Sequence, residues 1–446
     1  MKVHVGIDDT DSLRGGCTTY VAALLVEAFS KLEGLAFTDY PCLVRLNPNI
    51  PWKTRGNGAV CLRVMVEAEA LYGKLKSVAR RIVEEAFERF GGEPGLAFLK
   101  GEVPDTLKQL AFKAEWTVVE REEALTPFLE LGGEVESFGG GRGIIGAIAS
   151  IGETLEADHT FELLAYRTPE RWGSPRLLNP ASVRRMAEAN PQTFSNLDPE
   201  TGRILITPRG PDPVYFGVRG ETPEAVLKAS TMLELGEPVE RWLIFRSNQG
   251  TDAHLRVKRS ISLVPPYSCV VVEGWVSQPP ERIRGGHVIF KVSDGSGELF
   301  CAAYEPTGPL ARVASMLAVG DLVRLYGGVR KAEPLWEPTL NLEKLEVLRL
   351  AEAYREANPP CPKCGRRMKS LGAGKGFRCP KCKYRSREAG KVRLKVEREL
   401  RPGLYLAAPR AHRHLTKPSE RYGREKGEFS ILKLEKFWGY GWPPKI

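Results

Sequence analysis

The sequence predicts a multi-domain α+β protein. Its 446 residues exceed the length that one hydrophobic core usually organises, so about two to four domains are expected. The spacing of apolar residues changes along the chain, from alternating strands and helices in the first half to short strands with glycine turns in the second. Two Cys-x2-Cys pairs near the C-terminus predict a further small, metal-binding module.

Residues 1–154 are predicted to form an α/β or α+β domain. An alternating strand over 2–7 leads through an acidic, glycine-bearing loop into an apolar helix over 20–31. Two further strands enclose a polar loop over 47–58, and a long amphipathic helix follows. Ligands bind at the loops that follow strands in mixed sheets, so these loops are where a site is expected.

The next two segments predict two different sheet domains. Residues 155–262 combine strands, a hairpin and two helices, one of them with Thr222 as N-cap and Pro223 in its first turn, which favours a ferredoxin-like domain. Residues 263–352 contain five short strands, one helical insert and GG, DGSG and GD turns. That pattern is typical of an OB-fold barrel.

Residues 353–390 are predicted to be a zinc ribbon. Cys361, Cys364, Cys379 and Cys382 offer four thiolates in two knuckles, which suits a closed, structural Zn²⁺ site. A redox dithiol pair is the alternative, but a module this small needs a metal to fold. Residues 391–446 form a basic C-terminal segment that either contacts phosphates of a polyanionic partner or is simply a solvated surface.

An acidic loop follows the first strand. Asp8, Asp9 and Asp11 would repel one another unless a cation lies between them, and Mg²⁺ held with nucleotide phosphates fits best. A solvated acidic turn that caps the next helix is the alternative. The glycines that follow lead to Thr18 and Thr19 at a helix N-terminus, where free N–H groups favour phosphate. The Gly-Lys-Ser/Thr ending of a Walker A loop is absent, so a different ATP-binding fold is implied.

Two further loops combine cations with glycine and are predicted to contact phosphates, or else to be ordinary turns. One carries Lys53 and Arg55, and the other runs through Gly139 to Gly143 with Arg142. The residues predicted to bind ATP or its phosphates are Gly15, Gly16, Cys17, Thr19, Lys53, Arg55, Gly141, Arg142 and Gly143.

Composition and charge narrow the class of protein. The net charge of +10 and the pI near 9.1 suit a polyanionic partner. No window is apolar enough for a signal peptide or a membrane span, and five of the nine cysteines are scattered, so a cytoplasmic, reducing location is expected. No obligate protein partner is evident.

In the barrel, aromatic residues that either stack unpaired bases or fill the core are Trp275, His287, Phe290, Phe300 and Tyr304.

The ordered set of motifs resembles one family over essentially the full length, the archaeal tRNA(Ile) 2-agmatinylcytidine synthetases. The motifs that carry the resemblance are GIDDTDS (6–12), GGCTT (15–19), residues 138–147, PDPVYFGVRG (211–220), SNQGTDAH (247–254), GGHVIFKVSDGSG (285–297), AYEPT (303–307), the four cysteines and RHLTKP (413–418).

The resemblance implies a specific reaction and a specific domain order. ATP would activate the C2 oxygen of the wobble cytidine in the CAU anticodon of tRNA(Ile), through a phosphorylated cytidine, and agmatine would then displace that oxygen to form agmatidine. The domains would be kinase-like, ferredoxin-like, OB-fold and zinc ribbon, with the kinase-like domain at 1–154.

The resemblance also assigns residues. Asp8, Asp9 and Asp11 would hold Mg²⁺ and phosphates, and Thr18 resembles the family's autophosphorylated threonine. Agmatine needs a carboxylate in a narrow slot, and Asp212, Tyr215 and Asp252 are the residues expected there, although Asp212 could simply fix a turn and Asp252 could lie in a surface loop. Two other classes compete, namely a small-molecule kinase or nucleotidyltransferase and a non-catalytic single-strand-binding protein. A non-catalytic single-strand-binding protein would have no function for the acidic loop.

Overall fold

One sheet of eleven strands runs through both N-terminal domains of the computed structural model, which describes residues 1–332, 337–427, 434 and 436–444. Along the sheet the strands are β10 (Thr193–Phe194), β11 (Val214–Gly220), β9 (Thr160–Arg167), β12 (Val239–Ser247), β5 (Cys42–Arg45), β6 (Gly58–Val66), β1 (Lys2–Asp8), β7 (Gly95–Lys100) and β8 (Glu134–Ser137), with β24 (Trp438–Tyr440) beside β12 and β4 (Leu35–Phe37) beside β6.

A short parallel contact joins the two halves of this sheet. Strand β12 pairs with β5 through Arg246 with Cys42 and Ser247 with Leu43. The sheet therefore continues across residue 155, and the two domains are held together by backbone hydrogen bonds as well as by side chains.

Strand alternation places two hydrophobic cores on opposite faces of the sheet. In β6, Val60, Leu62 and Val64 face the core that contains helices α1 (Thr18–Ser30), α2 (Glu69–Phe90), α6 (Pro180–Ala189) and α7 (Pro223–Thr231). Ala59 and Cys61 face the other core, with α3 (Asp105–Trp116), α4 (Arg121–Glu130) and α5 (Ile144–Gly152). The predicted cap of α7 is confirmed, because the Thr222 hydroxyl accepts a hydrogen bond from the N–H of Ala225.

The OB-fold prediction is confirmed by the barrel. It consists of β13 (Cys269–Arg282), β14 (Val288–Ser293), β15 (Glu298–Ala303), β16 (Leu322–Arg330) and β17 (Thr339–Arg349), with α8 (Pro309–Ala314) as the helical insert. A parallel pairing of β15 with β17 closes it, and β23 (Gly403–Leu406) adds to β17. Phe290 is buried in its core, whereas Trp275 and Tyr304 are exposed.

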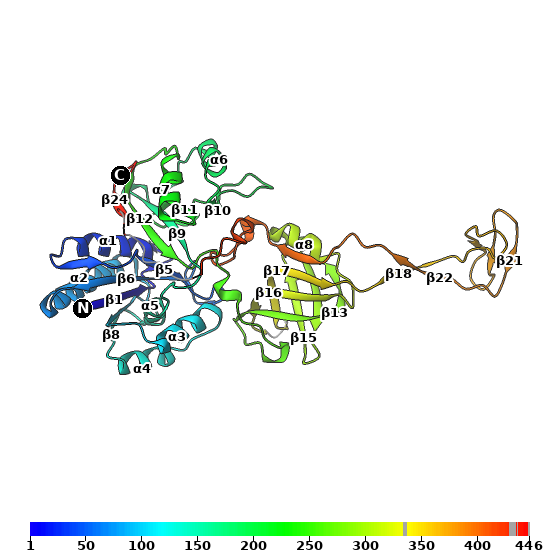
Figure 1. Ribbon diagram of the computed structural model, residues 1–446, viewed down its shortest axis with the longest axis horizontal. Helices are drawn as coiled ribbons and strands as arrows, with labels where there is room; N and C mark the ends of the chain where they lie inside the picture. The colour runs from blue at the N-terminus through cyan, green and yellow to red at the C-terminus, as the bar shows by residue number, and fades with distance from the viewer. Residues whose placement is uncertain (333–336, 428–433, 435, 445–446) are drawn as a thin grey trace.

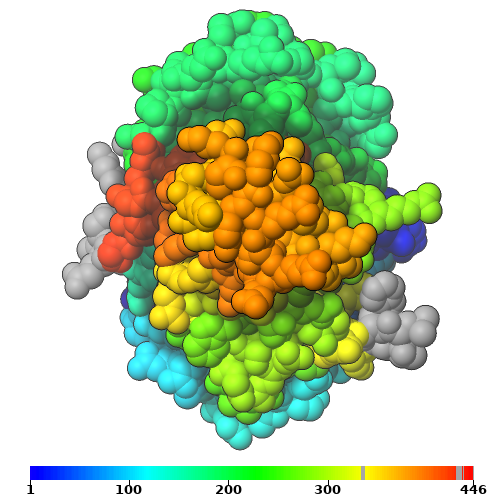
Figure 2. Space-filling view, turned by 90° about the vertical axis from the view of Figure 1, so that its right-hand side faces the viewer, coloured from blue at the N-terminus to red at the C-terminus, as the bar shows by residue number. Residues whose placement is uncertain are grey.

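The ribbon lies apart from the rest of the molecule. A two-stranded arm, β18 (Ala353–Ala357) with β22 (Val392–Val396), carries it away from the barrel (Figure 1). Its own strands are β19 (Lys369–Ser370), β20 (Phe377–Arg378) and β21 (Arg385–Ser386). Viewed from this end, the ribbon stands in front of the barrel and of both N-terminal domains (Figure 2).

The remaining elements are short. They are β2 (Asp11–Ser12), β3 (Gly15–Gly16), η1 (Pro169–Arg171), η2 (Ala253–Leu255), η3 (Ile261–Leu263), η4 (Glu305–Thr307), η5 (Pro409–Ala411) and η6 (Ser419–Arg421). Among the described residues, no helix combines the length and apolarity that crossing a membrane requires.

The C-terminal segment runs back over the body after leaving the ribbon. Arg410 pairs with Asp198 and Glu200, and the fully buried Arg421 pairs with Asp158 and Glu221. These cations are therefore committed to internal ion pairs and are neither a solvated surface nor free for phosphate.

Candidate active site

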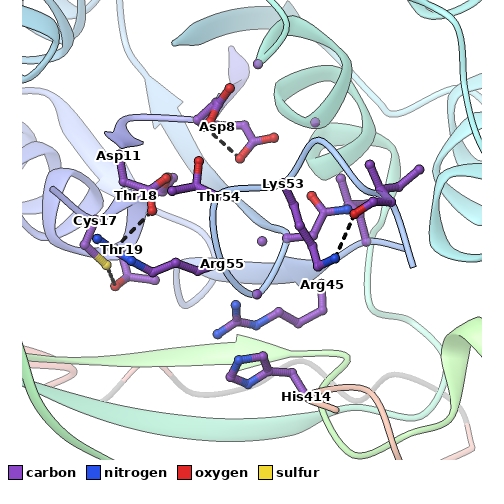
Figure 3. A pocket seen from close by; sticks show the side chains of 18 of the residues that line it. Asp8, Asp11, Cys17, Thr18, Thr19, Arg45, Lys53, Thr54, Arg55 and His414 are labelled. Carbon is purple, nitrogen blue, oxygen red and sulfur yellow. Dashed lines mark hydrogen bonds and ion pairs between the residues drawn. The ribbon is translucent and has the colours of Figure 1, made fainter. Parts of the chain in front are cut away.

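A cavity of about 620 Å³ lies between the N-terminal domain and the face of the second domain. Asp8, Asp9, Asp11, Cys17, Thr18, Thr19, Lys53, Arg55, Arg142, Gly143 and Asp212 all line it. Most of the residues predicted from separate loops thus meet in one place, and Figure 3 shows the acidic loop facing Lys53, Arg55 and Arg45 across this space.

The acidic loop is fixed by close packing of α5 on the end of β1. A Cβ at Gly146 would lie 1.8 Å from Oδ2 of Asp8, so only glycine lets the helix approach this carboxylate. The N–H of Asp9 donates to Oδ1 of Asp8 at 2.7 Å. Burial, reinforced by the neighbouring Asp9, raises the pKa of Asp8 to about 8. At neutral pH this carboxyl therefore keeps its proton for most of the time, and a cation bound beside it would favour the ionised form.

Two arginines approach the other two carboxylates. Arg142 Nη2 lies 3.0 Å from Oδ2 of Asp9, and Arg55 Nη1 lies 3.1 Å from Oδ2 of Asp11. Burial raises the pKa of Asp11 to about 6, and Arg55 opposes that rise. The site therefore holds three carboxylates and two guanidinium groups within one cavity wall.

Thr18 and Thr19 begin α1 and face the same space. The N–H and the hydroxyl of Thr10 lie 3.4 and 3.3 Å from Oγ1 of Thr18 and donate to it. The first turn of this 13-residue helix has no acidic residue, so its N–H groups and its dipole favour an anion there. Cys17 Sγ lies 3.0 Å from Oγ1 of Thr19.

Three of the predicted phosphate-loop glycines do not line the cavity. Gly15 and Gly16, with φ angles of 132° and 83°, shape the β2–β3 hairpin, and the Gly16 carbonyl accepts a hydrogen bond from Arg55 at 2.9 Å. Gly141 packs against Ser137. These positions support the loop backbone.

Of the three residues expected to bind agmatine, only Asp212 reaches the cavity. Burial raises its pKa, and Arg176 Nη2 lies 3.3 Å from its Oδ1. Tyr215 points elsewhere and donates to the carbonyl of Leu177. Asp252 accepts hydrogen bonds from Lys344 and from the N–H of Lys417 at the junction with the barrel, so the structure does not bring it to the site.

The cavity also contains functional groups that sequence reasoning missed. Arg45, Glu162, Arg219 and His414 line it, together with the apolar residues Leu164, Leu205, Ile206, Pro208 and Val214. Arg45 ends a buried strand and Glu162 lies inside one, so neither stands out by pattern. His414 and Arg219 lie in the RHLTKP and PDPVYFGVRG motifs, which were the available signals.

The four cysteines of the ribbon meet as predicted. Their Sγ atoms all lie within 4.8 Å of one another, and the Cys361–Cys382 and Cys364–Cys379 pairs are 3.4 Å apart. Tetrahedral zinc with bonds of about 2.3 Å to sulfur needs this separation. A second group, His254 with Cys269 and Glu343, is equally close, but Glu343 also accepts a hydrogen bond from Thr416 and pairs with Arg413, which makes it part of an internal polar network.

Comparisons with known proteins agree with this arrangement. Sequence models of the TiaS TCKD domain, the TiaS FLD domain, an OB-fold nucleic acid binding domain and the TiaS C-terminal zinc ribbon domain match residues 4–133, 141–254, 270–348 and 358–400. TiaS of Staphylothermus marinus, a 2-agmatinylcytidine synthetase named for an isoleucine tRNA, is 41% identical, over 96% of this chain and 95% of its own. The chain belongs to the TiaS family.

Solved TiaS structures have the same fold throughout. A complex of TiaS with an isoleucine tRNA and ATP superposes with a TM-score of 0.82 at 42% identity, covering 94% of this chain and 97% of that one. A complex of TiaS with an isoleucine tRNA, AMPCPP and agmatine gives 0.80 at 39% identity, covering 94% and 96%. The resemblance to this family that the motifs indicate is therefore confirmed over nearly the full length.

Proposed function

We propose that this protein joins agmatine to C2 of the wobble cytidine in the CAU anticodon of tRNA(Ile), using ATP and passing through a phosphorylated cytidine. The observation that carries the proposal is the meeting of Asp8, Asp9, Asp11, Thr18 and Asp212 in one cavity of a TiaS-family chain. Because TiaS relatives are named for this reaction and crystallised with an isoleucine tRNA, ATP and agmatine, the same substrates fit the same architecture here.

The acidic loop is suited to Mg²⁺. Hard oxygen ligands are what this ion prefers, and burial together with the neighbouring Asp9 raises the pKa of Asp8, an effect that a bound cation would oppose. Asp8, Asp9 and Asp11 would hold the ion, and when bound it would offset the charge of the triphosphate. Lys53, Arg142 and the N-terminus of α1 would orient the phosphates beside it.

Thr18 is the proposed phosphoryl acceptor within the protein. Its oxygen lies at the helix N-terminus and receives contacts from Thr10, so a phosphate there would meet a positive field without needing a cationic side chain. The cytidine must be activated because oxygen on C2 leaves poorly as oxide. Once that oxygen carries phosphate, the agmatine amine can bond to C2, the C2–O bond breaks, phosphate leaves and the amine loses a proton.

Agmatine is proposed to lie along the second-domain wall. Asp212 supplies a carboxylate for a cationic end, and Leu205, Ile206 and Val214 supply an apolar surface for the four-carbon chain. Agmatine lying against this wall would shield the activated carbon from competing water.

The C-terminal modules are proposed to hold the tRNA. The barrel exposes Trp275 and Tyr304, and the arm and ribbon carry many lysines and arginines that are exposed, such as Lys369 and Lys395. Because the arm extends the ribbon away from the cavity, it can reach a part of the tRNA distant from the anticodon. Such an enzyme would act in the cytoplasm, where its substrate is found.

One experiment tests the whole proposal. The protein is incubated with ATP, labelled agmatine and CAU-anticodon tRNA(Ile), and with elongator methionine tRNA as the control of identical anticodon. Label is expected in tRNA(Ile) alone and only when ATP is present. ATP turnover without any label transfer would instead favour a small-molecule kinase or nucleotidyltransferase.

A further inference from the structure

Arg45 is a guanidinium in the cavity that the proposed chemistry leaves without a role. It ends β5, and burial lowers its pKa to about 10, which still leaves it charged at neutral pH. Its Nε is buried without a hydrogen-bond partner, and the described part of the chain gives it no ion pair. Arg45 as a whole is half-buried and lines the cavity, so its charge is available to an anionic ligand there.

His414 adds a directed N–H beside this charge. Arg219 Nη2 lies 2.9 Å from Nδ1 of His414, and since a guanidinium can only donate, Nδ1 must be the acceptor. Burial and the neighbouring Arg45 and Arg219 hold the pKa of His414 well below its usual range, so the ring is neutral. A neutral ring with Nδ1 as acceptor carries its proton on Nε2.

Both groups point to one spot. A Cβ at Gly56 would lie 2.7 Å from Nε2 of His414 and 3.0 Å from Nη1 of Arg45, so both nitrogens lie close together against the Gly56 backbone, and all three residues line the cavity. Figure 3 shows the two side chains next to each other below Arg55. The nearby carboxylate, Glu162, has both oxygens occupied, by Arg219 at 2.9 Å and by Gln249 at 2.6 Å.

We propose that Arg45 and the Nε2–H of His414 form a phosphate subsite that takes a backbone phosphodiester of the RNA beside the nucleotide being modified. The guanidinium charge and the directed N–H together match the two non-bridging oxygens of a phosphodiester. Agmatine, the other charged substrate, is a cation that Arg45 would repel. The inference rests on the proposed function.

The RNA backbone is favoured over ATP as the source of that phosphate. The triphosphate has its own donors at the acidic-loop end, in Arg142 and the α1 terminus. The chain segment that carries His414 instead links the 47–58 loop to the barrel, because Arg413 donates to the Pro48 carbonyl at 2.8 Å and pairs with Glu343 of β17 at 3.2 Å. RNA lying on the barrel therefore meets the Arg45 wall as it enters the cavity.

The test combines protein variants with chemically modified RNA. Arg45→Met removes the charge and keeps the stem, and Arg45→Lys restores it. His414→Gln keeps an N–H near the Nε2 position, whereas His414→Asn keeps only the acceptor for Arg219. Arg80→Met, on the exposed side of α2, is the matched charge control. Binding of CAU tRNA(Ile) without ATP is measured with methylphosphonate at the linkage 5′ or 3′ of the wobble cytidine, and ATP binding is measured without RNA.

Arg45→Met is expected to weaken tRNA binding about 10- to 100-fold, as loss of a charge-assisted hydrogen bond does, while ATP binding and the thermal midpoint stay unchanged. One methylphosphonate should weaken wild-type binding equally and have no further effect on Arg45→Met. In tRNA binding, His414→Asn should come closer to the loss seen for Arg45→Met than His414→Gln does. The proposal would be overturned if the effects of Arg45→Met and of the methylphosphonate on tRNA binding were additive. It would also be overturned if Arg45→Met weakened tRNA binding no more than Arg80→Met, or weakened ATP binding instead. Label transfer by the wild type tests the proposed function separately.

Discussion

Arg55 Nη1 lies 3.1 Å from Oδ2 of Asp11 and thereby ties the 47–58 loop to the acidic loop across the cavity. The same Nη1 donates to the Gly16 carbonyl, so one side chain fixes both the carboxylate and the hairpin that precedes α1. The position of this arginine explains why two loops far apart in sequence act as one wall.

Replacing Arg55 by Met should therefore impair ATP use. Without this charge the pKa of Asp11, already raised to about 6, rises further, and Asp11 loses its negative charge at neutral pH. We expect the KM for ATP to rise at least about tenfold, from loss of one charge-assisted contact, with a steeper Mg²⁺ dependence. Arg55→Lys should recover part of the loss, and unchanged ATP kinetics in Arg55→Met would contradict this role.

Thr18 should be essential as a hydroxyl. Thr18→Val keeps the shape and removes the acceptor, so agmatine transfer should fall by at least about 10³-fold, as it does when a nucleophilic group is deleted. Thr18→Ser should keep measurable transfer. Asp9→Ala should be equally inactive, and both inactive variants should bind tRNA normally in a filter-binding or fluorescence titration. Full transfer by Thr18→Val and Asp9→Ala would refute the mechanism.

Asp212 and Tyr215 give a matched pair for agmatine. Asp212→Asn should raise the KM for agmatine about tenfold or more while leaving the KM for ATP unchanged, because it removes one charged partner from the cavity. Tyr215→Phe should leave both values unchanged, since the hydroxyl binds Leu177 outside the cavity. Equal effects of the two substitutions on agmatine would exclude Asp212 as its ligand.

Zinc removal should unfold the ribbon and nothing else. The ribbon's own core consists of Cys361, Met368, Phe377 and Cys379, and a two-stranded arm separates it from the barrel. Chelation, or Cys364→Ser, should thus leave the main thermal transition in place while tRNA affinity falls. A matching Ser386→Ala variant should keep its zinc. Loss of the main transition on chelation would show that the ribbon stabilises the body.

Glu343 should make the barrel–body junction sensitive to acid. Burial opposes ionisation, but His254 and Arg413 outweigh it and lower the Glu343 pKa from 4.5 to about 2. A depressed pKa stabilises the folded state above pH 4.5, and that contribution, about 3 kcal/mol, is lost as pH falls toward 2. Glu343→Gln should therefore lower the free energy of unfolding at pH 7. It should also make that free energy fall less as the pH drops below 4.5. Urea unfolding across this pH range measures both effects.

The sequence predicted the parts of this molecule that local pattern specifies. The five barrel strands, the α7 cap at Thr222 and the four-cysteine cluster follow from periodicity, capping chemistry and ligand spacing. The acidic loop was also recognisable, because three carboxylates that follow a buried strand repel one another unless a cation lies between them.

The local sequence pattern did not predict which strands and loops that are distant in sequence come together. Nothing local in Ser247 or Leu43 indicates that β12 and β5 pair and merge two domains into one sheet. His414 reaches the cavity from the opposite end of the chain, and Asp252 was misplaced because its loop turns toward Lys344 and the barrel. In each case tertiary contacts decide which of several plausible polar loops faces the cavity.

The late position of His414 in the chain has a consequence for biosynthesis. Synthesis proceeds from the N-terminus, so the acidic loop, Arg45 and Arg219 all leave the ribosome long before the residue that completes their shared wall. Strand β24, which borders β12, follows later still. A nascent or truncated chain that lacks residue 414 therefore lacks one side chain of the cavity wall, even when every N-terminal residue of that wall is present.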